Sequence, residues 1–112
     1  MEEKIDEELK QIEYMVEKLY QNDMIEIVDV LNQHFQNICH IMVTFINEID
    51  QYNAMGLQIP KDILIHQLRN LMEAYESQDV IMLADVLKYE INEGLLFYKE
   101  ILIQVRTNNN EQ

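Results

Sequence analysis

The sequence MIEIVDVLNQHFQNICHIMVTFINEI, residues 24–49, decides the fold of this chain. Its apolar residues recur in alternating steps of four and three, at Met24, Val28, Leu31, Phe35, Ile38, Met42, Phe45 and Ile49. An apolar period of about 3.5 residues is typical of helices that pack along a common seam. The stretch therefore predicts one long helix with a single inward face.

The same ladder returns 56 residues later in VIMLADVLKYEINEGLLFYKEILIQV, residues 80–105. Its corresponding positions are Val80, Ala84, Leu87, Ile91, Gly94, Tyr98, Ile101 and Val105. Two interpretations stay open. The chain contains an internal duplication of one helical unit, or helical periodicity imitates a repeat.

A shorter ladder precedes each long one, at Ile5, Leu9, Ile12, Val16 and Leu19, and at Leu64, Leu68, Leu71 and Tyr75. Asp23 and Asp79 each follow a short polar break and suit the N-cap of a long helix. Gly56 can end the first long helix in a left-handed conformation, and Pro60 suits the start of the next helix. We predict helices at residues 3–20, 23–54, 60–76 and 79–106, and a frayed polar tail at 107–112.

These elements predict a single all-α domain of residues 1–106. Two glycines, one proline and no tryptophan leave few turns to place in 112 residues. Short breaks make neighbouring helices antiparallel, so the simplest arrangement is an antiparallel four-helix bundle of two short–long helical hairpins.

The chain is strongly acidic, with a net charge of −13. Residues 1–56 hold 12 acidic and 3 basic side chains, a net of −9. Such a charge opposes binding to nucleic acid and to anionic lipid, so neither is an expected partner. The N-terminal acidic residues are interpreted as a solvated helix face: Glu2, Glu3, Asp6, Glu7, Glu8, Glu13 and Glu17. The alternative is an acidic regulator that mimics nucleic acid.

Cysteine usage and hydropathy favour a cytoplasmic protein. Cys39 is the only cysteine, so no disulfide can form within the chain. No basic stretch precedes a short apolar one, as a secretory signal requires. The sequence contains no run of about 18 apolar residues, so no membrane span is expected.

No residue pattern predicts catalysis, a cofactor or a metal site. His34 and His40 point about 120° apart on a helix and do not readily share a metal, and His40 is expected at the surface. Cys39 precedes His40, but adjacent helical side chains diverge by about 100°, which prevents a thiolate–imidazole pair. The acidic pairs Glu26-x-x-Asp29 and Glu73-x-x-Glu76 leave one enzymatic alternative, a metal-dependent helical nucleotide pyrophosphatase.

The two halves differ on their outer faces. In the first long helix the outermost positions are polar: Glu26, Gln33, His40 and Asn47. The equivalent positions of the second are Met82, Tyr89, Leu96 and Ile103, with Val86 beside them. Either this helix is covered on both sides, or the stripe docks an amphipathic helix of a client or of a second copy, which makes a dimer. We predict a non-enzymatic protein-binding module that uses Met82, Val86, Tyr89, Leu96 and Ile103.

The segment DVIMLADVLKYEINE, residues 79–93, resembles a pattern in small uncharacterised helical proteins of low-GC Gram-positive bacteria such as clostridia. This resemblance implies no active-site residue. A small acidic helical protein with an apolar helix face is also similar in architecture to flagellar and secretion export chaperones, which implies a chaperone-like or adaptor-like role.

Overall fold

The computed structural model describes residues 1–110, and within that range the chain is helical with no β-strand. The predicted all-α class is confirmed. The elements are α1 (Glu2–Tyr20), α2 (Met24–Ala54), α3 (Lys61–Ser77), α4 (Val80–Asp85), the π-helix η1 (Val86–Ile91) and α5 (Asn92–Asn110).

The last three elements form one continuous helical segment. The backbone keeps right-handed helical angles at Asp85 and at Asn92, on either side of η1. A π-helix bonds residue i to residue i+5, so it absorbs an extra residue and changes the direction of the side chains that follow. Helix α5 continues to Asn110, which corrects the start of the predicted tail. Residues 111–112 lie outside the described residues.

The turns that precede α2 and α4 share one unusual backbone conformation. Asn22 has a φ of 57° and Gln78, 56 residues later, has a φ of 58°. The Oδ1 atom of Asp79 accepts the backbone N–H of Met82 at 3.0 Å, which makes the predicted N-cap. Asp23 occupies the equivalent position, but its side chain makes no such bond. The predicted N-cap position of Asp23 is therefore confirmed, but its side chain makes no capping hydrogen bond.

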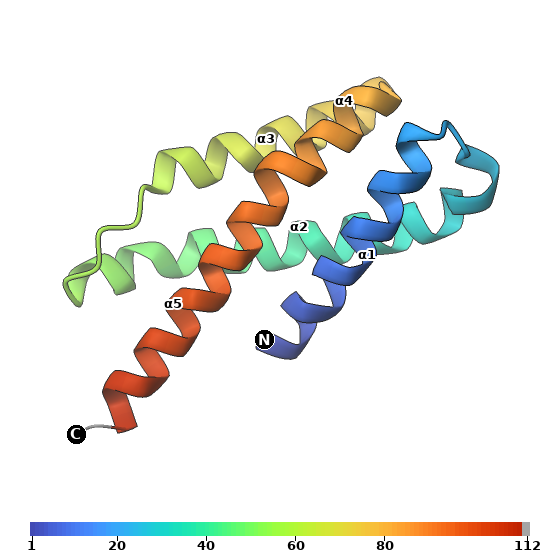
Figure 1. The fold of residues 1–112 in the computed structure, drawn as a ribbon. Helices are drawn as coiled ribbons and strands as arrows, with labels where there is room; N and C mark the ends of the chain where they lie inside the picture. The colour runs from blue at the N-terminus through green and yellow to red at the C-terminus, as the bar shows by residue number, and fades with distance from the viewer. Residues whose placement is uncertain (111–112) are drawn as a thin grey trace.

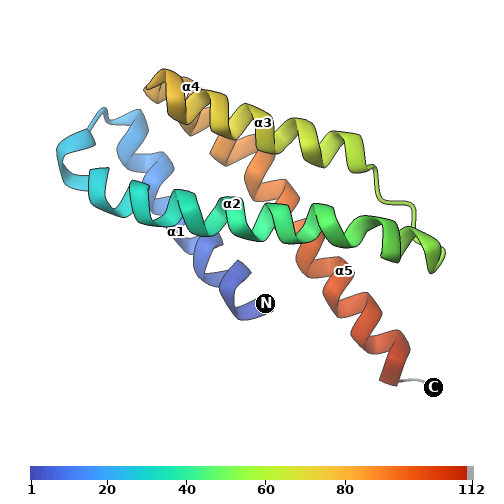
Figure 2. The ribbon, with the colours of Figure 1, turned by 180° about the vertical axis from the view of Figure 1, so that it is seen from behind.

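The helices form two layers that cross one another (Figure 1). One layer contains α2 and α3, and the other contains α1 and the segment from α4 to α5 (Figure 2). The C-terminal end of α5 extends past the other helices in both views. The molecule is correspondingly elongated, with principal extents of 51 × 25 × 18 Å.

From Leu31 onward the core of α2 follows the predicted ladder, except that Phe35 is only half-buried. The buried members are Leu31, Ile38, Met42, Phe45 and Ile49. Near the start of α2 the ladder is wrong, because Val28 is exposed and Ile27 is buried instead. The first turns of α2 face α1, as the 3.2 Å ion pair between Lys18 and Glu26 shows. The buried face is therefore one residue away from its predicted place there.

Gly94 allows the two layers to approach closely where α5 crosses α2 and α3. A Cβ atom at this position would lie 2.8 Å from Gln67 Oε1 on α3 and 3.4 Å from Met42 Cε on α2. Nearby, the Phe45 and Tyr98 rings stack with centroids 4.3 Å apart. The absent side chain at residue 94 and this aromatic pair together set the crossing point.

Candidate functional site

Helices α1 and α5 are joined by polar side-chain contacts along their interface. These contacts are Glu2–Arg106 at 2.7 Å, Asp6–Lys99 at 2.6 Å and, where α1 meets α4, Tyr20–Asp85 at 2.5 Å. Low residue numbers on α1 pair with high numbers on the facing segment, so the two run antiparallel.

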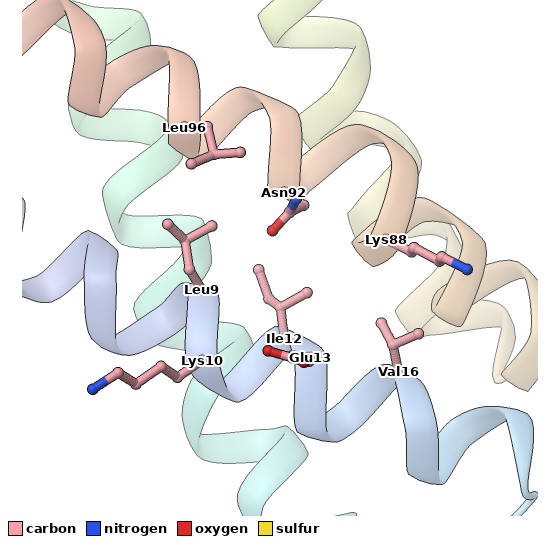
Figure 3. A pocket seen from close by; sticks show the side chains of 8 residues that line it. All are labelled: Leu9, Lys10, Ile12, Glu13, Val16, Lys88, Asn92 and Leu96. Atoms are coloured by element: carbon pink, nitrogen blue, oxygen red, sulfur yellow. The ribbon is translucent and has the colours of Figure 1, made fainter.

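Between the Asp6–Lys99 and Tyr20–Asp85 contacts lies a groove of about 410 Å³ (Figure 3), here called the α1–α5 groove. Its lining residues are Leu9, Lys10, Ile12, Glu13, Val16, Lys88, Asn92 and Leu96. Leu9, Ile12 and Val16 reach from α1 toward the facing helix (Figure 3). Within residues 1–110, no side-chain hydrogen bond or ion pair joins its two walls. Apolar side chains of a partner could therefore enter the groove without displacing a polar bridge.

The π-helix η1 supplies part of the second wall. Lys88 lies within η1, and Asn92 is the first residue after it. Single π-helical turns within α-helices are frequent at functional sites, because the extra residue re-aims neighbouring side chains. No residue type in VLKYEI, residues 86–91, predicted this irregularity.

The structure separates the five residues of the predicted stripe. Val86 is only 5% exposed and belongs to the core, so its predicted place on an exposed stripe is wrong. Met82 is half-buried against the core. Tyr89 is 58% exposed, and Leu96 and Ile103 are also exposed. The stripe changes from covered to open inside η1, between Val86 and Tyr89, where a π-helix alters the direction of the side chains.

The Lys88 ammonium group, which belongs to a residue lining the groove, lies near the rings of both Tyr20 and Tyr89. Lys88 Nζ is 5.7 Å from the ring centroid of Tyr20 and 5.1 Å from that of Tyr89, within the range of cation–π attraction. The hydrogen bond from Tyr20 to Asp85, together with partial burial, raises the pKa of Tyr20 to about 12. The hydroxyl therefore stays a neutral donor at physiological pH.

The α1 wall of the groove was not predicted from the sequence. Ile12 and Val16 were assigned to the core ladder, and both are indeed buried. Only the register between α1 and α5 shows that the same residues form the α1 wall of the groove. No local pattern could have shown this, because Val16 and Leu96 are 80 residues apart.

A second feature that sequence reasoning missed is a buried polar cluster between α1 and α2. Glu8 is only 4% exposed, which corrects its assignment to a solvated acidic face. Its Oε2 lies 2.8 Å from His34 Nδ1, and its Oε1 accepts a hydrogen bond from Asn37 Nδ2 at 3.2 Å. The sequence spacing indicates that Glu8 is buried, because Glu8 lies three residues after Ile5 and four residues before Ile12, on the apolar face of the helix.

Glu48 organises a second polar cluster, where α2 meets α5. Its Oε2 accepts hydrogen bonds from Tyr52 at 2.5 Å and from Tyr98 at 2.9 Å. Burial, followed by the hydrogen bond to Glu48, raises the pKa of both hydroxyls well above the usual range. These tyrosines are thus fixed as neutral donors in the helix interface.

The remaining candidate groups offer little reactivity. Burial raises the pKa of the Cys39 thiol to about 11, so the nucleophilic thiolate is scarce at neutral pH. His40 is exposed, as predicted. In the part of the chain that the structure describes, no three His, Cys, Asp or Glu side chains are grouped to hold a metal ion.

A family model for a domain of unknown function, DUF8042, matches residues 1–100. This chain belongs to the DUF8042 family. The match covers both walls of the α1–α5 groove, which end at Leu96, and stops before Ile103. No curated protein and no solved structure matches the chain. No helix of this DUF8042 protein, within residues 1–110, is long and apolar enough to cross a membrane.

Proposed function

We propose that this DUF8042 protein is a non-enzymatic binding module whose α1–α5 groove holds an amphipathic helix of a partner protein. The observation that carries the proposal is the exposed apolar stripe beside an unbridged groove. Leu96 belongs to both, because it is exposed on the stripe and lines the groove. Large apolar side chains next to a concave apolar surface are typical of helix-in-groove recognition.

The spacing of the stripe fits a helical partner. Tyr89, Leu96 and Ile103 are seven residues apart, which is two helical turns. The distance from residue 89 to residue 103 along the axis is roughly 21 Å at 1.5 Å per residue, the length of about 14 helical residues. Tyr89 supplies an anchor of the kind enriched in binding hot spots.

A separate partner fits better than a second copy of this chain. Each copy of the chain carries a net charge of −13, and the mutual repulsion of two such chains opposes a close dimer. A chaperone-like or adaptor-like role agrees with this preference, since such proteins bind helical segments of other chains. A dimer through the α1–α5 groove is an alternative outcome that the measured mass would reveal.

The test is selection of helical peptides from a displayed library against the wild-type protein, followed by affinity measurements. Leu96→Glu places a carboxylate in the groove and should weaken the selected peptide about tenfold or more, because a charge at the centre of an apolar contact is poorly solvated. Val43→Glu, on the exposed face of α2, is the matched control and should leave the affinity unchanged. Equal loss in both variants, or in neither, would contradict the proposal.

We also infer that the two halves of the chain derive from an internal duplication within an antiparallel bundle of two helical hairpins. The inference is supported by the left-handed residues Asn22 and Gln78, 56 positions apart, each followed by an aspartate. The isoleucines two residues after these aspartates, Ile25 and Ile81, are both exposed. A fragment of residues 1–56 that assembles into a helical dimer would support the duplication, and an unfolded fragment would count against it.

A further inference from the structure

A second apolar depression, here called the turn cleft, lies where the two aspartate-containing turns meet. It has a volume of about 300 Å³ and is lined by Met24, Val28, Leu31, Asn32, Tyr75, Gln78, Val80 and Leu83. These residues come from the start of α2, the end of α3 and the start of α4, which gather at one end of the molecule (Figure 2). The turn cleft shares no lining residue with the α1–α5 groove.

The walls of the turn cleft are held together by an aromatic stack. The Phe35 and Tyr75 rings are parallel within 12°, with centroids 3.8 Å apart. The Tyr75 hydroxyl also donates to Asn32 Oδ1. These contacts tie α2 to α3, so the cleft is formed before any ligand arrives.

Exposed isoleucine side chains lie next in sequence to residues that line the turn cleft. Ile25 is 95% exposed and stands one helical turn before Val28, which is itself exposed and lines the cleft. Ile81 is also exposed and follows Val80, which lines the cleft from α4. Substituting side chains this exposed removes no packing from the core. The same side chains add apolar surface close to the cleft.

The segments that form the turn cleft contain no cationic side chain. The sequence has no Lys or Arg from residue 19 to residue 60 or from residue 70 to residue 87. The same segments place four carboxylates close in sequence to the lining residues, and none of the four forms an ion pair within residues 1–110: Asp23, Asp29, Glu76 and Asp79. Lys18, which approaches from α1, is paired with Glu26 at 3.2 Å, and Lys88 lies by the rings of Tyr20 and Tyr89.

We propose that the turn cleft is a second docking site, independent of the α1–α5 groove, for a cationic amphipathic helical segment of a partner. An apolar side chain of the partner enters between Val28 and Tyr75, and its Lys or Arg residues meet the surrounding carboxylates. Charge complementarity selects this occupant. A second copy of this chain would bring the same carboxylates against each other.

The test uses a labelled 14-residue Leu/Lys helix with all leucines on one face, and fluorescence anisotropy at low salt. Two controls are a Leu/Glu peptide of the same pattern and a shuffled Leu/Lys peptide without an apolar face. The variants are Ile25→Glu and Ile25→Lys, which remove the same apolar contact and differ by two charges. Because Ile25 is 95% exposed, neither substitution disturbs the core.

We expect the amphipathic cationic peptide to bind the wild-type protein, and Ile25→Lys to weaken it about tenfold more than Ile25→Glu does, because like charges at an interface repel. Ile63→Lys, an exposed apolar site on α3, serves as the control and should change the affinity far less. Three results would overturn the proposal. The shuffled peptide binds as tightly as the amphipathic one, or Ile25→Lys and Ile63→Lys weaken binding equally. In the third, the protein dimerises without peptide and Ile25→Lys blocks that dimer. Leu96→Glu should leave this binding intact, so the two sites can fail separately.

Discussion

The Glu8 carboxylate on α1 and the His34 imidazole on α2 lie 2.8 Å apart in the helix interface, where each side chain is almost enclosed. Asn37 provides the only other polar side chain within hydrogen-bonding distance of Glu8 among residues 1–110. A buried carboxylate that keeps its partners is tolerated, whereas one that loses a partner is costly. The pairing therefore fixes how α1 lies on α2.

We predict that His34→Ala lowers the free energy of unfolding by about 1–3 kcal/mol, the cost of a buried polar group left without a partner. Urea denaturation followed by circular dichroism measures it. His40→Ala is the matched control on the exposed face of the same helix, with an expected change within about 0.5 kcal/mol. The double variant Glu8→Leu/His34→Leu should recover most of the loss. Equal stability of the His34 and His40 variants would contradict this role of the cluster.

The two turn aspartates provide a second comparison. Asp79 caps α4 through the Met82 N–H, while Asp23 makes no equivalent bond before α2. Asp79→Ala should therefore cost about 1 kcal/mol of stability, the typical value of an N-cap. Asp23→Ala should cost clearly less. If thermal or urea unfolding shows the same loss in both, the difference in capping between the turns is not real.

Gly94 and Gln67 should show energetic coupling. Alanine normally stabilises a helix over glycine by about 0.5–1 kcal/mol, but a Cβ at residue 94 meets Gln67 Oε1 at 2.8 Å. That oxygen is buried without a hydrogen-bond partner in the described structure. We expect Gly94→Ala to be more favourable in a Gln67→Ala background than in the wild type. A double-mutant cycle measures the coupling, and strictly additive effects would show that the two positions do not touch.

The Tyr20 hydroxyl should ionise at a higher pH than an unperturbed tyrosine does. Its pKa is raised to about 12 from 10, chiefly by the hydrogen bond to Asp85, so the folded state favours the neutral hydroxyl. The stability linked to this group is fully present below pH 10 and is lost as the pH rises from 10 through 12. Asp85→Asn should bring the Tyr20 pKa back toward 10 in an ultraviolet difference titration. The same titration of a Tyr20→Phe protein identifies the signal, and an unchanged curve for Asp85→Asn would refute the assignment.

The sequence was sufficient to predict the helices and much of the core, because apolar periodicity is local information. Leu31, Ile38 and Met42 are buried as the ladder of α2 predicted. The exposure of Val28 and the burial of Val86 could not be predicted, since they depend on where α1 lies and on the π-helix. Both degrees of burial result from tertiary packing, and the types of the residues concerned do not indicate them.

The candidate site was predicted only in part, for the same reason. Tyr89, Leu96 and Ile103 follow from comparing the outer faces of the two halves, and all three are exposed. The opposite wall, at Leu9 and Ile12, depends on the antiparallel register between α1 and α5. A single sequence gives the residues of both helices but does not show which of them face one another.

Hydrogen–deuterium exchange, with and without a library-selected helical peptide, tests whether the α1–α5 groove binds a helix. When the peptide is bound, we predict slower exchange in residues 9–16 and in residues 88–103, the two walls of the groove, and unchanged exchange around Val43 on α2. Protection confined to α2 and α3, or no protection of residues 9–16, would contradict it.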